Sequence, residues 1–221
     1  MCPFCNVEMN RIGSNATKRD PFDVSSRILF ESGSVYVCAG LSPLTFPYAL
    51  IVTKRHFRSF ANSDQGERRD VIKALQILLG SGFFRSGQLT VFEHGDVCPL
   101  PNTECLDHFH LHVMDGGLDI ISAFLKEKPE AGKVSVSENH PLLLNENYFL
   151  IGNYTGGTEM EIFTTPNLSC GRQYFRRMIA LEAGLQEWDW RKALNEPMTQ
   201  RLIDSWAKIS VKPKIDNAGI S

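Results

Sequence analysis

The sequence predicts an α+β protein with a mostly antiparallel sheet, flanking helices and a C-terminal helical extension. Two observations lead to this prediction. Short runs of strand-forming residues alternate with stretches of helical periodicity, and neighbouring strand runs are separated by only a few turn-forming residues, as in hairpins. The chain has 221 residues, of which 43% are hydrophobic and 22% charged, so it can bury one ordinary globular core.

The first predicted elements are a hairpin and an inner strand. Residues 27–31 and 34–38 are mainly apolar and flank a Ser-Gly pair that can form the turn. Residues 48–53 are rich in strand formers and end at a Lys-Arg-His segment. We expect this third run to lie inside the sheet.

A long helix and two further strands should follow. Asp64 and Glu67 have the spacing of a capping box, and apolar residues then recur at helical intervals until Gly80. We expect this amphipathic helix to cross the sheet. Residues 89–93 and 105–113 are predicted strands, joined by a loop that contains two prolines.

The signals are weaker after residue 115. The remaining predicted elements are a short helix, a second hairpin that could extend the sheet, and two helices, at residues 120–126, 148–153 with 159–164, 169–184 and 195–206. We therefore expect a core domain at residues 1–118 and a C-terminal extension at residues 119–221 that packs on the same domain.

The overall charge argues against polyanionic partners. A formal net charge of -2 at pH 7 provides no broad attraction for polynucleotides or anionic membranes, so a bound phosphate must be held locally. No apolar run is long enough to span a bilayer, and the N-terminus lacks the basic and apolar regions of a signal peptide. We therefore expect a cytoplasmic protein with its six cysteines reduced.

The most informative segment carries three of the six histidines within five residues. Side chains alternate between the two faces of a strand, so His108, His110 and His112 should share one face. The apolar residues between them should face the core. Alternate side chains lie about 6.5 to 7 Å apart along a strand, close enough for neighbouring imidazoles to act on one phosphate.

Several chemistries fit this pattern. A histidine can attack phosphorus and form a P–N bond that is easily broken again, while a neighbouring imidazole donates to phosphorus oxygens or assists the leaving group. The alternatives are three surface histidines or a metal site. A metallohydrolase of the His-x-His-x-Asp-His type would need an aspartate after the second histidine, and a cupin would add a second histidine strand; the sequence shows neither.

Residues 108–114, His-Phe-His-Leu-His-Val-Met, resemble the signature of the histidine-triad (HIT) superfamily. The upstream strand, helix and loop also come in the order that this family shows, so the resemblance covers about residues 2–114. It implies a HIT-like fold, His110 as the nucleophile, His112 in contact with the phosphate under attack, and hydrolysis or transfer at a nucleotide α-phosphorus. Many members have Ser or Thr where this chain has Cys105, so the expected phosphate contact there is the backbone N–H.

A zinc site is also expected. Cys2 and Cys5 have the spacing of a metal-binding pair, and tetrahedral zinc needs two further ligands. His56 and His108 are the candidates, with His94 as the alternative to His56. Several HIT proteins and the related galactose-1-phosphate uridylyltransferases resemble this arrangement, which implies a structural zinc. A redox pair is the alternative, although residues 1–20 show no thioredoxin-like unit.

A basic helix near the C-terminus is a second candidate for phosphate binding. Gln173, Arg176 and Arg177 stand at i, i+3 and i+4 and should project from one helix face, where the arginines could clamp a distal phosphate. A solvated basic face is the alternative interpretation. The segment up to residue 191 resembles an extension of some longer bacterial HIT-like proteins and also dinucleoside tetraphosphate phosphorylases. The opposite helix face is expected to pack through Tyr174, Met178 and Leu181.

Together these features predict a hydrolase that acts on a nucleoside phosphate anhydride or phosphoramidate through a nucleotidyl-histidine intermediate. A nucleotidyltransferase or phosphorylase differs only in the acceptor and stays open. The pattern also leaves open a metal-dependent enzyme with three histidine ligands and a nucleotide-binding module without turnover. The expected partner is a small nucleotide, with no polynucleotide and no membrane. Many HIT proteins are homodimers, so the resemblance also points to a homodimer.

Overall fold

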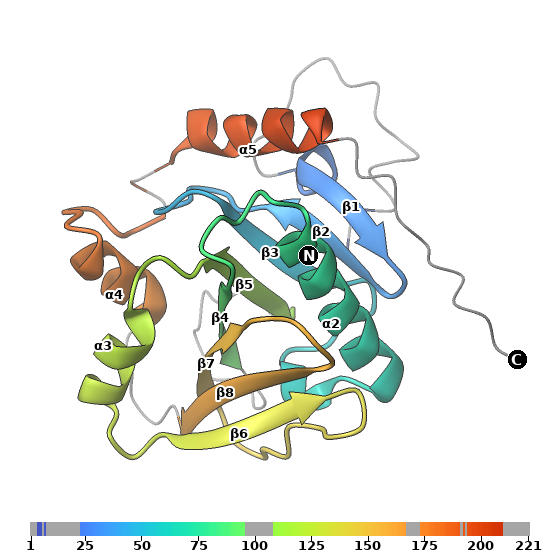
Figure 1. Cartoon of the computed structure of the whole chain (residues 1–221), viewed down its shortest axis with the longest axis vertical. Coiled ribbons are helices and arrows are strands. Elements are labelled where there is room, and N and C mark those ends of the chain that lie inside the picture. Colours follow the sequence, from blue (N-terminus) through green and yellow to red (C-terminus); the bar gives the residue numbers. More distant parts are fainter. Residues whose placement is uncertain are drawn as a thin grey trace, which may run out of the picture.

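The computed structural model describes residues 4, 5, 7, 23–95, 108–166, 173–190, 192 and 194–209. These residues form one sheet of eight strands with helices on both of its faces (Figure 1). The strands are β1 (Ile28–Ser32), β2 (Val35–Ala39), β3 (Tyr48–Thr53), β4 (Leu89–Gly95), β5 (His110–Asp115), β6 (Gly132–Ser137), β7 (Tyr148–Tyr154) and β8 (Glu159–Pro166). The helices are α2 (Gln65–Gly80), α3 (Ile120–Glu127), α4 (Tyr174–Glu182) and α5 (Glu196–Lys208). The predicted α+β class is confirmed.

The sheet is antiparallel throughout. The strand order is β1-β2-β3-β5-β4-β7-β8-β6, and every neighbouring pair runs antiparallel. Strand β5 therefore lies between β3 and β4, in the interior of the sheet. The strands that follow residue 118 continue the same sheet, because β7 pairs with β4 along its whole length.

Several elements begin and end where local sequence signals place them. β1 and β2 form the predicted hairpin, with Gly33 at a φ of 57° in the turn. The capping box of α2 is present, because the Asp64 carboxylate accepts the N–H of Glu67 and the Glu67 carboxylate accepts the N–H of Asp64. At the start of α5, the side chain of Asn195 accepts the N–H of Met198. The second hairpin, β7 with β8, also forms as predicted.

Two apolar cores lie on opposite faces of the sheet. Helix α2 packs on one face, over the fully buried side chains of Phe109, Leu111 and Val113. Helices α3 and α4 pack on the other face, as Figure 1 shows. The histidines that alternate with these apolar residues therefore lie on the side of α3 and α4. Within the described ranges, no helix has the length and apolar character needed to cross a membrane.

Three local predictions differ from the structure. β5 begins at His110 rather than at residue 105, so the first of the three histidines precedes the strand. β6 is not among the predicted strands, although Val134 and Val136 alternate with polar residues as in a strand with one buried face. Leu181 is 66% exposed, so its predicted packing is wrong. The buried stripe of α4 is formed instead by Tyr174, Phe175, Met178 and Ile179.

A buried carboxyl group, Glu93 of β4, anchors the segment that follows β3. The backbone N–H of Phe60 donates to one of its oxygens at 2.9 Å, and the hydroxyl of Tyr148 donates to the other at 2.8 Å. Burial raises the pKa of Glu93 from 4.5 to about 8, against the effect of these two hydrogen bonds. The folded protein therefore holds this proton at pH values where the unfolded chain has released it.

We expect the Glu93→Gln variant to lose less stability than the wild type as the pH rises. Because the folded pKa is raised, the contribution of Glu93 is fully present below pH 4.5 and is lost as the pH rises toward about 8. From about pH 5 to about pH 8, the wild type should lose on the order of 3 kcal/mol more of its free energy of unfolding than Glu93→Gln does. Urea unfolding at both pH values measures it, with the exposed Glu161→Gln as the control. Parallel pH profiles for wild type and Glu93→Gln would contradict this account.

Candidate active site and metal centre

Three neighbouring strands gather polar side chains on the face covered by α3 and α4. His110 and His112 are alternate residues of β5 and share this face. Leu50 of β3 and Phe92 of β4 lie directly opposite His112 in the sheet register. Tyr48, two residues before Leu50, reaches His112 along the diagonal, as a long aromatic side chain can. The candidate site therefore stands on the interior strands of the sheet.

The ring of His110 is held by the backbone just before it. Its Nδ1 lies 2.8 Å from the carbonyl oxygen of His108. A carbonyl oxygen only accepts, so Nδ1 carries a proton and donates it. Burial lowers the pKa of His110, against this hydrogen bond and together with the nearby His94. The ring is therefore neutral near pH 7, and Nε2 keeps a lone pair that can act as a nucleophile.

His112 is fixed by two aromatic residues. Its Nδ1 lies 2.7 Å from the hydroxyl oxygen of Tyr48. Its ring stacks on Phe92, with centroids 4.6 Å apart and an angle of 6° between the planes. Burial, and then the repulsion from a protonated His110 and from the charge of Arg176, place the pKa of His112 well below its usual value. The ring of His112 is therefore also neutral near pH 7, and it lies 4.9 Å from the ring of His110.

Arg176 reaches this region from α4. Its side chain is buried, and it donates from Nε to the carbonyl of Trp188 and from Nη1 to the carbonyl of Ser42, each at 2.9 Å. Its third nitrogen, Nη2, is buried and makes no hydrogen bond of good geometry within the described residues, although the Tyr48 hydroxyl lies close enough to the guanidinium to act as an acceptor. An unsatisfied buried donor is costly, and the charge of Arg176 acts on His112, so Nη2 is a candidate to bind an anion.

The two other polar residues predicted on this helix have different surroundings. The amide of Gln173 donates to Asp189 and accepts the N–H of Trp190, which ties the start of α4 to the segment after it. Arg177 is exposed and lies 5.9 Å from the ring centre of Tyr174. The predicted pair of arginines is thus divided between a buried and an exposed position.

His94 of β4 belongs to the same group. It lies on the same face of β4 as Phe92, its ring is 5.0 Å from that of Phe149, and a proton on it would disfavour a proton on His110 or His112. Burial lowers the pKa of His94 itself. The sequence indicated His94 mainly as an alternative zinc ligand. Its alternation with Phe92 on a strand beside the histidine segment is the signal that indicates its present position.

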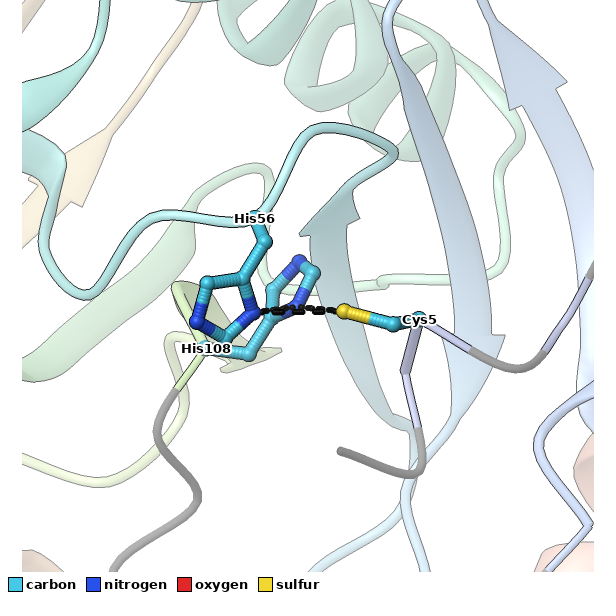
Figure 2. A group of neighbouring side chains, drawn as sticks. All are labelled: Cys5, His56 and His108. Carbon is cyan, nitrogen blue, oxygen red and sulfur yellow. Dashed lines mark hydrogen bonds between the residues drawn. The ribbon is translucent and has the colours of Figure 1, made fainter. Parts of the chain in front are cut away.

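A second cluster joins three segments that are far apart in the sequence. Cys5, His56 and His108 bring their ring nitrogens and sulfur together, as Figure 2 shows. The N–H of Phe109 donates to the carbonyl of Phe57 at 2.6 Å, which holds the segments of the two histidines side by side. The sulfur lies 3.2 Å from Nδ1 of His56 and 3.5 Å from Nδ1 of His108, and the two nitrogens are 3.3 Å apart.

These distances fit three corners of a tetrahedral zinc site. Zinc bonds of about 2.3 Å to sulfur and about 2.0 to 2.1 Å to nitrogen place two nitrogens about 3.3 Å apart, and sulfur and nitrogen about 3.6 Å apart. The other nitrogen of His108, Nε2, lies 2.8 Å from the carbonyl oxygen of Thr53 and must donate to it. In the neutral ring, Nδ1 of His108 is therefore unprotonated, as a metal ligand must be.

Two predicted site residues, Cys2 and Cys105, lie outside the described residues, as does the predicted loop between β4 and His108. Cys2 as the fourth zinc ligand and the backbone of Cys105 as a phosphate contact therefore stay predictions. Of the predicted ligands within the described residues, Cys5, His56 and His108 come together.

The fold and these side chains define an α+β protein with a group of imidazoles on its interior strands and a separate Cys-His cluster. No protein-family model matches the chain, and no curated protein matches it. It is similar to the structure of yeast Ap4A phosphorylase Apa2 in complex with AMP, with 12% sequence identity and a TM-score of 0.39, over 65% of this chain and 61% of the yeast chain. The matched region thus spans less than two thirds of the yeast chain. A second structure of yeast Ap4A phosphorylase Apa2 has 13% identity and a TM-score of 0.41, over 85% of this chain and 81% of the yeast chain.

Proposed function

We propose that this protein is a HIT-like enzyme that processes small nucleotides through a covalent bond between phosphorus and Nε2 of His110. The observation that carries the proposal is the hydrogen bond of 2.8 Å from Nδ1 of His110 to the carbonyl oxygen of His108. It selects the tautomer in which Nε2 is unprotonated, and nucleophilic attack needs that lone pair. The neighbouring His112 is the candidate contact for the phosphate under attack.

The reaction consists of two displacements at the same phosphorus. In the first, the lone pair of Nε2 forms a P–N bond while the bond to the leaving group breaks, and the leaving group takes the bonding electrons. In the second, water attacks the phosphorus, its proton passes to solvent, and the P–N bond breaks with return of the electron pair to Nε2. The carbonyl of His108 stabilises the positive ring between the two steps. A transferase or phosphorylase would use another acceptor in place of water.

We also propose that Cys5, His56 and His108, together with Cys2, hold a structural zinc ion. The three described ligands have the spacing that tetrahedral zinc requires. When bound, zinc would cross-link the N-terminal segment to the residues just before β5. The ring of His108 would bind the metal, while the backbone carbonyl of His108 orients the ring of His110. His110 would therefore not be a metal ligand.

A catalytic metal held by all three histidines has less support. Nδ1 of His110 donates to a carbonyl, while the ring of His108 lies among Cys5 and His56 instead of beside His112. Analysis of metal content with an activity assay separates the two kinds of site. A catalytic metal would leave the Cys5→Ser variant fully active, whereas a structural zinc would be lost from it.

A substrate panel tests the proposed function. Dinucleoside polyphosphates, nucleotide sugars and nucleoside phosphoramidates are incubated with the protein, with and without inorganic phosphate. We expect hydrolysis of at least one class and, after acid-free quenching, label from an α-³²P nucleotide on His110. Turnover that depends on phosphate would identify a phosphorylase. Nucleotide binding without labelling of the protein and without turnover would indicate a nucleotide-binding module and would contradict the proposal.

Arg176 should contribute to binding of the nucleotide phosphates. The Arg176→Gln variant removes the buried guanidinium and its charge beside His112, so we expect KM to rise about tenfold or more, the cost of one charged hydrogen bond. The exposed Arg177→Gln is the matched control and should change KM little. Steady-state kinetics measures both, and thermal unfolding reports the separate loss of the bonds to Ser42 and Trp188. An equal KM for both variants would remove Arg176 from the site.

A further inference from the structure

Tyr48 is a buried tyrosine beside His112 that has no role in the two displacement steps described above. The residue is 2% exposed, and its hydroxyl oxygen lies 2.7 Å from Nδ1 of His112. Because Phe92 stacks on the same imidazole, the ring of His112 has little freedom to turn. The position of the proton between Tyr48 and His112 therefore decides what the other ring nitrogen, Nε2, can do.

Two arrangements of this proton can be compared. If Nδ1 of His112 carries it, the ring donates to Tyr48 and Nε2 can only accept. If Tyr48 donates to Nδ1, the neutral ring carries its proton on Nε2 and can donate to a phosphate oxygen.

Two observations favour donation by Tyr48. Burial raises the pKa of Tyr48, so the hydroxyl keeps its proton. The guanidinium of Arg176 is close enough for its charge to act on both Tyr48 and His112. Arginine has only donors, so the lone pairs of the Tyr48 oxygen face that cation and its proton is directed to the remaining partner, His112.

We infer that Tyr48 is a positioning residue that holds His112 as the Nε2–H tautomer, so that His112 donates a hydrogen bond to a non-bridging oxygen of the phosphate attacked by His110. This inference rests on the proposed function. It gives the two neighbouring imidazoles opposite tautomers, since His110 is protonated on Nδ1 by its bond to a carbonyl. One ring then supplies a lone pair to phosphorus and the other supplies a donor to its oxygen. The lone pair on His110 and the donor on His112 together suit an anionic phosphoryl group with an unprotonated oxygen.

The tautomer can be measured without any substrate. In protein with ¹⁵N-labelled histidine, long-range ¹H–¹⁵N spectra distinguish a protonated from an unprotonated ring nitrogen. We expect wild-type His112 to be protonated on Nε2, and the Tyr48→Phe variant to show a mixture of tautomers. Tyr154→Phe is the matched control, because Tyr154 is also buried and donates one hydrogen bond, to the carbonyl of Gly157, in the other core. It should leave His112 unchanged.

Kinetics provides the second measurement. Because only part of His112 would keep the donating tautomer in the Tyr48→Phe variant, kcat should fall severalfold, up to about tenfold, with a much smaller change in KM. A wild-type His112 protonated on Nδ1 would overturn the inference, and so would a Tyr48→Phe variant with an unchanged tautomer and unchanged kcat. If no nucleotide is turned over, the proposed function fails, but the spectra still decide whether Tyr48 sets the tautomer.

Discussion

Replacing His110 by alanine will abolish turnover of every nucleotide that the wild type accepts. The covalent route needs the lone pair on Nε2, and alanine offers none at that phosphorus, so kcat should fall by at least about 10³-fold. The label from an α-³²P nucleotide should disappear from the protein at the same time. Single-turnover assays with quenching under alkaline conditions, where phosphoramidates survive, measure both effects.

The control for His110→Ala is His140→Ala. His140 is exposed, and its ring lies near Ser137 at the end of β6. It should keep wild-type kcat and labelling. Because His110 is only partly buried and belongs to neither apolar core, His110→Ala should also keep the wild-type unfolding curve within about 1 kcal/mol. Substantial turnover by a folded His110→Ala protein would refute the nucleophile assignment.

Removal of the proposed zinc is expected to cause the largest change in stability. Structural zinc contributes its binding free energy to folding, so chelation or the Cys5→Ser substitution should lower Tm by more than about 10 °C. Purified wild type should contain about one zinc ion per chain, the stoichiometry of a single closed site. Metal analysis and calorimetry on the same samples provide the measurements.

Cys38→Ala is the matched control for the metal prediction. Cys38 is fully buried in β2, and burial raises the pKa of its thiol to about 11, so it stays protonated and is a poor ligand. This variant should lose some stability through its small cavity but keep its zinc. Metal-free wild type, or full zinc content in Cys5→Ser, would rule out the proposed site.

Local chemistry explains which elements the sequence predicts well. β3 and the start of α2 match the prediction because their signals are local: a run of strand formers in one case and the Asp64 capping box in the other. The alternation in β5 likewise predicts that Phe109, Leu111 and Val113 face a core. The start of β5 is different, because its pairing with β3 begins only at His110, and strand pairing depends on residues that are far apart in the sequence.

The contacts of the candidate site depend on that same long-range pairing. Tyr48 meets His112 because β3 and β5 are neighbours in one particular register, and a shift of one residue would turn Tyr48 to the other face. Arg176 follows His112 by 64 residues in the chain (176 − 112), so its helical spacing predicted the face on which it lies but not its neighbour in the fold. Cys5 was predicted as a metal ligand from its spacing to Cys2, whereas the family resemblance supported His56 as its partner, with His94 as the alternative.

The oxygen that orients His110 is a backbone atom of residue 108, whereas the proposed metal ligand of that residue is its ring. Every amino acid supplies such an oxygen, so no substitution at position 108 can remove it unless the peptide itself moves. Evolution can therefore exchange the ring, and the metal with it, for another side chain that packs equally well, without altering the tautomer of His110. In the proposed scheme, metal binding and catalysis would therefore be inherited separately, although residue 108 contributes to both.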